Sequence, residues 1–267
     1  MTLEVLAVTM NQNDNSLYEK MNIRTDAIIA NQCDRYDYSE YDMNGKTLKM
    51  ISTGDRGVGK NRNQALLCAT ADILLFADDD GIYRDDYEEK ILEAYERLPY
   101  ADIIVFDVSI HNTDRKSRKE KKAIKKVGLM NFMRYGTYCV SARRESLLKG
   151  NIWFSLLYGG GARYSSGEDS LFLKEALDKG LKIYFYPYNM ADVLQQESTW
   201  FKGYNDKFFI DKGIWTANAF PFLKYLCTVY FAYRFKKLAP EYTHKQIFKL
   251  VLSGIKEFKR RQNKSQD

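Results

Sequence analysis

ILLFADDD, residues Ile73–Asp80, is the stretch of sequence that decides the fold. Its first five residues are apolar and are bounded by acids, which predicts a strand buried on both faces of a sheet. Three carboxylates follow without a break, so this core strand is expected to stop at a polar edge. Asp78 and Asp80 alternate with Asp79 along a pleated strand, so the first and third acids point to the same side.

Asp78 and Asp80 therefore form a candidate metal site. Two carboxylates roughly 4 Å apart repel each other by about 4 kcal/mol at an effective dielectric constant of about 20. A divalent cation removes that repulsion, and Mg²⁺ or Mn²⁺ is commonly held by one or two carboxylates together with substrate phosphates. The alternative is an acidic loop in front of the helix that Asp85 and Asp86 open.

Length and composition are those of a soluble globular protein. The 267 residues fit one large or two small domains and can bury a substantial core. Hydrophobic residues make up 45% of the chain and charged residues 28%, which excludes a largely disordered chain. The net charge is +6, and Lys and Arg concentrate in residues 115–126 and near the C-terminus, which indicates anionic partners such as phosphates or an acidic lipid surface.

The four cysteines indicate a reducing compartment. They are widely spaced and no pair has metal-ligand spacing, so we interpret them as reduced thiols of a cytosolic protein, although spacing does not exclude a disulfide. The N-terminal residues lack the charged, apolar and small-residue order of a signal peptide. The cysteines are Cys33, Cys68, Cys139 and Cys227.

Around ILLFADDD, apolar runs alternate with helical segments, which predicts an α/β sheet layered by helices. In such sheets ligands bind beyond the carboxyl ends of the strands, where this chain places Asn, Gln and Asp. We expect residues 36–45 to be irregular and residues 111–126 to form a solvated loop or, alternatively, a mobile flap or anion-binding patch. One helix is expected to end near residue 71, and two more are expected at 85–98 and 167–179. Pro187 is expected to end the last strand. The expected strands are 3–9, 26–30, 48–52, 73–77, 102–108, 137–142 and 181–186.

A basic loop with two glycines, Gly57-x-Gly59-Lys60-x-Arg62, opens one of these helices. It is not a Walker loop, because Asn61 stands where Ser or Thr must follow Lys, and it lacks the third glycine of the dinucleotide fingerprint. Backbone N–H groups and the two cationic side chains at a helix start can still bind a diphosphate. The alternative is an ordinary turn with solvated charges.

Glu168 and Asp169 open another helix after the run Gly159–Gly161. Acids in a first helical turn stabilise the helix by up to about 1 kcal/mol, so a purely structural role is the alternative. Three glycines in a row cost entropy unless the backbone approaches another group closely or moves. A helix start at the end of such a loop can place one carboxylate at a pocket mouth as a base, and only one, because neighbouring helical residues point about 100° apart.

Taken in order, these segments resemble the family 2 glycosyltransferases of the GT-A fold. The resemblance covers roughly residues 3–190. It implies a Rossmann-like nucleotide-binding sheet with helices on both faces. It rests on a strand that ends near Thr9, Asp34 after the second strand, Gly57-x-Gly59-x-x-Arg62-Asn63, Asp78-x-Asp80 and Gly167-Glu168-Asp169.

The resemblance also implies roles for single residues. In that family the Asp-x-Asp motif holds Mg²⁺ or Mn²⁺ on the diphosphate of a sugar nucleotide, and the acid of a Glu-Asp motif is the base. Asp169 is then the expected base with Glu168 second, and Asp78 and Asp80 are the expected metal ligands. The expected donor-binding residues are Thr9, Asn11 and Asp34 at the nucleotide base, Asp78 at the ribose, and Gly57, Lys60, Arg62 and Asp79 elsewhere along the nucleotide and its phosphates.

Two departures from the family pattern affect the metal site. Many such enzymes complete the metal shell with a downstream histidine, but the only histidine after Asp169 is His244. Residues 195–202, QQESTWFK, occupy the comparable region, so another polar side chain or water would have to substitute. Gly81 stands where the family often has a further acid.

The last quarter of the chain is aromatic and basic. Within its aromatic stretch, residues 217–238, the longest uncharged run is 225–233, which is too short for the roughly 20 residues that span a bilayer. This region can rest on an anionic membrane surface or, alternatively, form a helical pair packed on the catalytic domain. We expect a catalytic domain at 1–215, with a nucleotide-sugar half at 1–110 and an acceptor half at 127–215, and a helical extension with a basic tail at 216–267.

Together these features predict a metal-dependent, inverting glycosyltransferase that moves a sugar from a nucleoside-diphosphate sugar, first of all a UDP-sugar, to a saccharide or lipid-linked saccharide. The resemblance alone implies a role in bacterial surface polysaccharide assembly. We expect a cytoplasmic protein in peripheral contact with the anionic inner face of the cell membrane, and no nucleic-acid partner. The alternatives are a nucleotidyltransferase, which would release pyrophosphate, and a non-catalytic protein that binds nucleotide sugars or polyanions.

Overall fold

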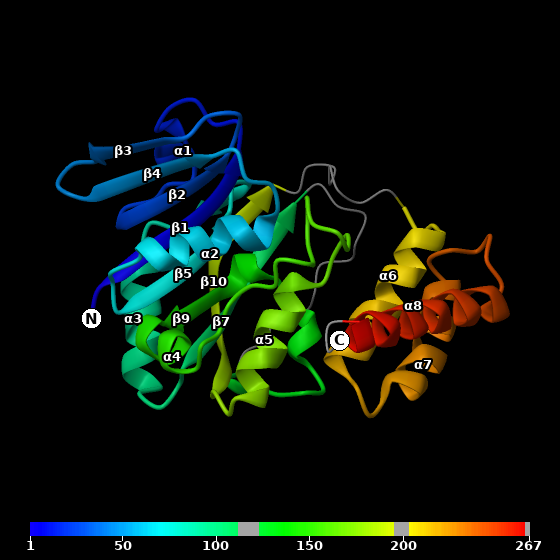
Figure 1. Ribbon diagram of the computed structural model, residues 1–267. Coiled ribbons are helices and arrows are strands. Elements are labelled where there is room, and N and C mark those ends of the chain that lie inside the picture. The colour runs from blue at the N-terminus through cyan, green and yellow to red at the C-terminus, as the bar shows by residue number, and fades with distance from the viewer. Residues whose placement is uncertain (112–122, 195–202, 265–267) are drawn as a thin grey trace. The chain divides into compact units, whose positions relative to one another are not determined.

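The computed structural model describes residues 1–111, 123–194 and 203–264 (Figure 1). The chain forms two compact units. The sheet unit comprises Met1–Ala162 and Glu168–Ser198, and the helical unit comprises Arg163–Gly167 and Thr199–Asp267.

One ten-stranded sheet forms the centre of the sheet unit, in the order β3-β4-β2-β1-β5-β9-β7-β10-β6, with β8 pairing with β10. Helices flank this sheet (Figure 1). The predicted α/β class is therefore confirmed. The strands are β1 (Leu3–Met10), β2 (Asp26–Gln32), β3 (Asp37–Asp42), β4 (Thr47–Thr53), β5 (Ile73–Asp78), β6 (Gly81–Tyr83), β7 (Ile103–His111), β8 (Lys125–Val127), β9 (Val140–Arg143) and β10 (Ile183–Leu194).

The sheet is mostly parallel around the ILLFADDD strand. β1 pairs in parallel with β2 on one side and β5 on the other, and β2 pairs in parallel with β4. β9 runs antiparallel between β5 and β7. The apolar residues of β5 are fully buried, as their uninterrupted run predicted. The carboxyl ends of β1, β2, β4 and β5 consequently meet at one edge of the sheet.

Helices of the sheet unit present short apolar faces to the strands. α2 packs on β1 and β2, and α3 packs on β10. In α3 the apolar face, which includes Tyr87, Ile91, Ala94 and Tyr95, is buried. The helices are α1 (Ser16–Lys20), α2 (Val58–Cys68), α3 (Tyr87–Arg97), α4 (Arg144–Lys149) and α5 (Glu168–Asp178), with 3-10 turns η1 (Phe132–Arg134) and η2 (Thr137–Cys139).

Three expectations about secondary structure are wrong. The stretch expected to be irregular, residues 36–45, contains β3, an edge strand whose exposed acids discourage further pairing. Pro187 does not end its strand, because β10 continues past it through a register shift between Phe185 and Asn189, where an irregular ladder tolerates proline. Residues 137–139 form η2, so β9 starts only at Val140.

The helical unit contains α6 (Asp206–Ala219), α7 (Lys224–Lys236) and α8 (His244–Lys264). α6 and α8 approach closely at two glycines: a Cβ on Gly213 would lie 2.0 Å from the Val251 carbonyl oxygen, and one on Gly254 would lie 2.0 Å from that of Ile210. The predicted boundary between residues 215 and 216 falls inside α6, and the assignment of nucleotide-sugar and acceptor halves stays a prediction. Among the described residues, no helix is both long and apolar enough to cross a membrane.

Candidate functional site

Arg62 is the centre of the candidate site. Its side chain, on α2, is only 4% exposed. Nη2 donates to Asp78 Oδ1 at 2.6 Å, and Nη1 donates to Asp169 Oδ1 at 2.9 Å and to Glu168 Oε1 at 3.3 Å. One guanidinium thus joins the end of β5 to the start of α5, two segments about ninety residues apart in the chain.

An aromatic cluster under Arg62 explains why these elements meet. Phe154 stacks on Phe172 of α5 with ring centroids 4.2 Å apart, and Phe76 of β5 meets both rings edge-on at 5.2 and 5.5 Å. The guanidinium carbon of Arg62 lies 5.3 Å from the centre of the Phe154 ring. Asn63 fixes the same segment to α2, because its side-chain amide makes two 2.8 Å hydrogen bonds with the backbone of Phe154.

The glycine run Gly159–Gly161, which was predicted to permit a close backbone approach, does so, and Gly59 of the basic loop does the same. A Cβ on Gly59 would lie 2.3 Å from the Ser155 carbonyl oxygen. Gly159 has a φ of +104°, and a Cβ there would lie 2.7 Å from the carboxyl carbon of Glu168. The backbone N–H of Val58 donates to the Gly160 carbonyl at 2.9 Å, so the glycine run lies against the start of α2. Side chains at these positions would push α2 and α5 apart.

Asp169 is held by two donors on one oxygen. Besides Arg62, the hydroxyl of Thr137 donates to Asp169 Oδ1 at 2.5 Å. Thr137 is buried in η2, just before β9, and no local sequence signal identifies it, because it lies 32 residues from its partner. The Asp169 side chain is 30% exposed, whereas that of Glu168 is 13% exposed and packs against Gly159. Asp169 is therefore the more accessible of the two acids.

The site concentrates negative charge in a poorly solvated place. Burial, followed by repulsion from Asp169, raises the pKa of Glu168 to about 7. Burial, followed by repulsion from Asp78 and Asp79, raises the pKa of Asp80 to about 6. Both effects penalise the ionised carboxylate, so a cation added here would be stabilised.

The predicted metal ligands fit a cation in part. Burial is the main cause of the raised pKa of Asp80 and repulsion from Asp78 is the next, and such mutual repulsion is expected of a carboxylate pair that binds a divalent ion. One oxygen of Asp78 is already bound by Arg62. Within the described residues, no group of three or more His, Cys, Asp or Glu side chains could hold a metal ion. Residues 195–202, where a further ligand was expected, lie outside the described part of the chain.

Other predicted residues surround the carboxyl ends of β1, β2 and β4. Thr9 is buried, and its hydroxyl donates to Asp79 Oδ2 at 2.6 Å. The exposed Asn11 follows β1 with a φ of +55°. Gly57 has a φ of +122°, and its N–H donates to the side chain of buried Gln32 at 2.8 Å. Gln32 was not predicted, although its place at a strand end is a usable signal.

Two predicted residues pair with side chains outside the predicted set. Asp34 accepts from Arg56 at 2.7 Å, and Lys60 lies 2.7 Å from Asp55. Both pairs are exposed enough that water and salt weaken them, so a phosphate or a nucleotide base could replace either partner. The structure thus gathers Arg62, Asp78, Glu168 and Asp169 into one network, pairs Thr9 with Asp79, and leaves Asp34 and Lys60 in separate ion pairs.

Comparisons with known proteins agree with the fold of the sheet unit. Residues 24–152 match the family model described as glycosyl transferase family 2. Residues 1–349 of S. aureus TarS in complex with UDP-GlcNAc share the fold with a TM-score of 0.63 at 18% identity, covering 89% of this chain and 73% of that one. The same fragment in complex with UDP gives a TM-score of 0.60 at 18% identity, and the match covers 89% of this chain and 72% of that one. A comparison with curated protein sequences found no match.

Proposed function

We propose that this chain is a family 2 glycosyl transferase that moves a sugar from a UDP-sugar to a saccharide or lipid-linked saccharide, on the basis of its GT-A fold and of the match of residues 24–152 to the family model. The observation that carries the proposal is the Arg62 network, which gathers the end of β5 and the start of α5 at one edge of the sheet. The UDP-GlcNAc complex of TarS supports a uridine donor. The family match favours sugar transfer over nucleotidyl transfer.

Asp169 is the proposed general base. Its Oδ1 accepts from Arg62 and Thr137, and no described residue donates to Oδ2, which is therefore the oxygen that can receive the proton of an acceptor hydroxyl. The acceptor oxygen would attack the anomeric carbon from the side opposite the diphosphate, with inversion. Glu168 is packed against the glycine run, so it shapes the charge of the site rather than meeting the acceptor.

Arg62 acts as a positioning residue in this proposal. The sequence suggested that it contacts the nucleotide or phosphates, but its guanidinium is engaged by three carboxylates. Removing it would leave those charges uncompensated in a poorly solvated site. Its role is to set the relative position of Asp78 and Asp169, and so of donor and base.

Asp78 and Asp80 are the proposed ligands of Mg²⁺ or Mn²⁺. A bound divalent ion would offset the charge that grows on the departing diphosphate. Thr9, Asn11, Asp34, Asp79, Gly57 and Lys60 complete the proposed donor site around the ends of β1, β2 and β4.

The cellular setting is also a proposal. We place the enzyme in the cytoplasm, at the inner face of a bacterial membrane, in the assembly of a surface polysaccharide. The family match of residues 24–152 supports sugar transfer, and a lipid-linked acceptor would explain a basic, aromatic C-terminal part.

The donor is tested by calorimetric titration of UDP, GDP, dTDP and CMP, each with and without Mn²⁺. We expect UDP to bind, and to bind more tightly with Mn²⁺. Asp80→Ala should lose the effect of Mn²⁺ while it keeps the fold. If no nucleotide binds with metal present, the proposed donor site is wrong, and an effect of Mn²⁺ that persists in Asp80→Ala removes Asp80 from the metal site.

A further inference from the structure

α7 carries an exposed apolar stripe that the fold does not use. Phe222, just before the helix, is 97% exposed, and Leu226 and Tyr233 are 68% and 65% exposed. Leu226 and Tyr233, seven residues apart, lie on one helical face together with Val229 and Tyr230, which are also exposed, and Phe222 precedes this face in the chain. We call these five residues the α7 stripe. Contiguous exposed apolar side chains of this kind mark an interaction site.

The opposite face of α7 already anchors the helix. Phe231 and Phe235 are buried. The ring centroids of Phe235 and Phe209 of α6 are 5.9 Å apart, and those of Phe231 and Trp215 are 6.3 Å apart. Thr228 and Ala232 are also buried on this face. The helical unit therefore does not need the α7 stripe for its core, which leaves that stripe available to a partner.

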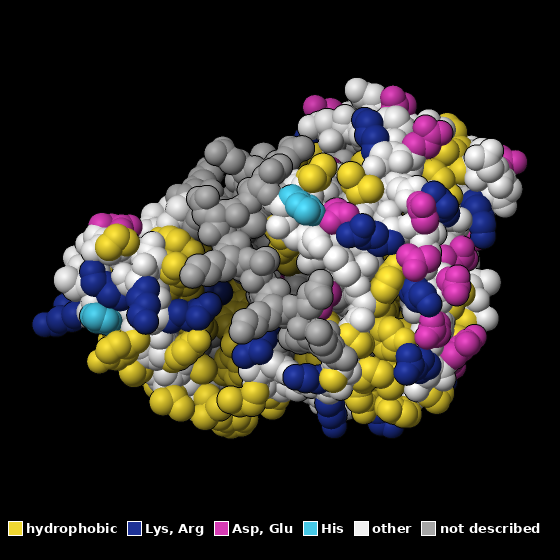
Figure 2. Space-filling view, turned by 180° about the vertical axis from the view of Figure 1, so that it is seen from behind, with side chains coloured by type: hydrophobic (Ala, Val, Ile, Leu, Met, Phe, Trp, Pro, Cys, Tyr) yellow, Lys and Arg dark blue, Asp and Glu magenta, His cyan; other side chains and the backbone are white. Residues whose placement is uncertain are grey.

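Positive charge surrounds the stripe. Residues 203–264 contain thirteen Lys and Arg against four Asp and Glu, a net charge of +9, whereas the whole chain carries +6. At the two ends of the stripe, the Lys224 and Lys236 amino groups donate to the backbone carbonyls of Pro221 and Pro240. Figure 2 shows hydrophobic and basic side chains together on the part of the molecule that contains this unit.

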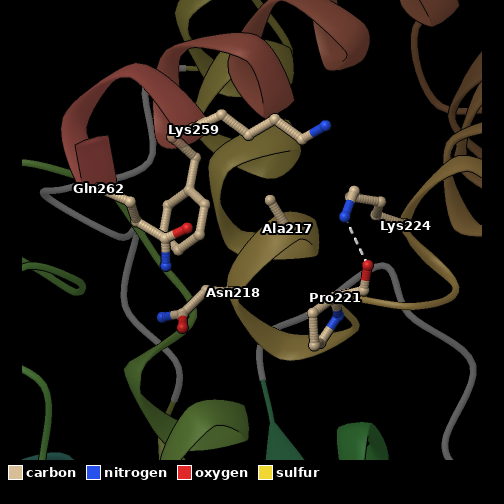
Figure 3. Close-up of a pocket in the computed structure, with 7 residues that line it drawn as sticks. Ala217, Asn218, Pro221, Lys224, Lys259 and Gln262 are labelled. Atoms are coloured by element: carbon tan, nitrogen blue, oxygen red, sulfur yellow. Dashed lines mark hydrogen bonds between the residues drawn. The ribbon is translucent and has the colours of Figure 1, made fainter.

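Two pockets beside α7 have the same mixed character. One, of about 200 Å³, is lined by Lys224, Lys259, Asn218 and Gln262, and the amino groups of both lysines lie on the same side of it (Figure 3). The other, of about 680 Å³, lies at the C-terminal end of α7 and includes Tyr230, Arg234, Lys236, Lys237 and His244. Both offer donors and cations suited to phosphate oxygens at the level of the stripe's ends.

We propose that the α7 stripe docks on the surface of an anionic lipid bilayer. Its apolar side chains would enter the boundary between headgroups and acyl chains, while the tyrosine hydroxyls and the lysines at both ends meet the phosphates. A second copy of this chain is a poor occupant, because it would set the same positive charge opposite itself. Anionic lipid supplies both the apolar layer and the opposite charge that the surface presents.

Docking by the α7 stripe gives the C-terminal part a role in substrate access. It would hold the enzyme at the surface where a lipid-linked acceptor is met, and this consequence rests on the proposed function. The docking itself does not, because it follows from exposure and charge alone.

Vesicle sedimentation tests the docking. The full chain is mixed with vesicles of phosphatidylcholine alone or of equal parts phosphatidylcholine and phosphatidylglycerol. We expect binding to the anionic vesicles only, weakened about ten-fold or more by Leu226→Ser and about five-fold by Lys236→Gln. The matched control is Leu67→Ser on α2, where the leucine is 69% exposed, and it should bind like the wild type.

Three results would overturn the proposal. They are equal binding to both kinds of vesicle, unchanged binding by Leu226→Ser, and a dimer in solution that Leu226→Ser dissociates while vesicle binding stays at background. Release of UDP from a UDP-sugar in solution should be the same for Leu226→Ser and the wild type. That assay separates a failure of docking from a failure of the proposed transfer activity.

Discussion

The sheet unit and the helical unit distribute charge and apolar surface in opposite ways. In the sheet unit the apolar strands are buried, and carboxylates converge around Arg62 in a poorly solvated site. In the helical unit the charge is mostly exposed and mostly basic, while an apolar stripe on α7 remains exposed. In each unit the candidate functional surface is the place where the usual rule, apolar inside and charge outside, is broken.

The difference shows how each unit is expected to work. Converging carboxylates raise one another's pKa and create a demand for cations, which suits binding of a metal and a proton. An uncovered apolar stripe bordered by lysines has no such chemistry and suits attachment to a surface. Substitutions that remove the carboxylate network should leave the helical unit unaffected, and substitutions that remove the apolar stripe should leave the sheet unit unaffected. This independence can be tested.

The largest effect is expected from Arg62→Met, which removes the guanidinium from three carboxylates. Leaving buried charges unpaired should lower the free energy of unfolding by about 3–5 kcal/mol and abolish transfer. Urea denaturation at neutral pH measures the loss. Arg97→Met, whose side chain is exposed, is the control and should change stability by less than about 1 kcal/mol. Equal losses in both variants would mean that the Arg62 network is no different from a surface ion pair.

A smaller effect is expected from pH, through Glu168. Its pKa is raised from 4.5 to about 7, so the folded state holds the proton more tightly than the unfolded state. The resulting stabilisation is complete below about pH 4.5 and is lost as the pH rises through 7, a loss of a few kcal/mol from this group. Denaturation at several pH values in metal-free buffer measures it, and Glu168→Gln should remove this part of the slope. An unchanged slope in that variant would show that another group causes it.

The smallest effect in this series is expected from Thr137→Val. The variant loses the hydroxyl that donates to Asp169 Oδ1, so the carboxylate is less firmly oriented toward the acceptor and kcat should fall about ten-fold. Steady-state kinetics should show this fall in kcat with little change in the KM for the donor, and Thr137→Ser, which keeps the hydroxyl, should restore the rate. An equal loss of rate in the Val and Ser variants would indicate that the threonine only fills space.

Strand ends were the most predictable part of the molecule. The uninterrupted apolar run of β5 and the acids after it specified a buried strand and its polar edge, because a parallel core strand tolerates no polar residue on either face. The Gly-Gly-Gly run likewise predicted a close backbone approach, which the contacts with Val58 and Glu168 confirm. In both cases the signal is local and has one physical cause.

Contacts between distant segments were not predictable. Thr137 reaches Asp169 only because η2, β9 and α5 are placed by the whole sheet. Arg62 was expected at a phosphate because a helix start with glycines suits anions, but three carboxylates from elsewhere in the chain engage it. The prediction that Pro187 ends its strand was wrong. A proline is normally excluded from a strand, and the register shift that accommodates this one is seen only in the pairing with the neighbouring strand.

The most direct measurement is release of UDP from a UDP-sugar in the presence of Mn²⁺ and a saccharide acceptor, for the wild type and Asp169→Asn. We expect acceptor-dependent release by the wild type, a drop of about 10²-fold or more in Asp169→Asn, and an affinity for UDP that calorimetry finds unchanged in that variant. Near-normal turnover by Asp169→Asn would contradict the assignment of the base. Release of pyrophosphate in place of UDP would contradict sugar transfer itself.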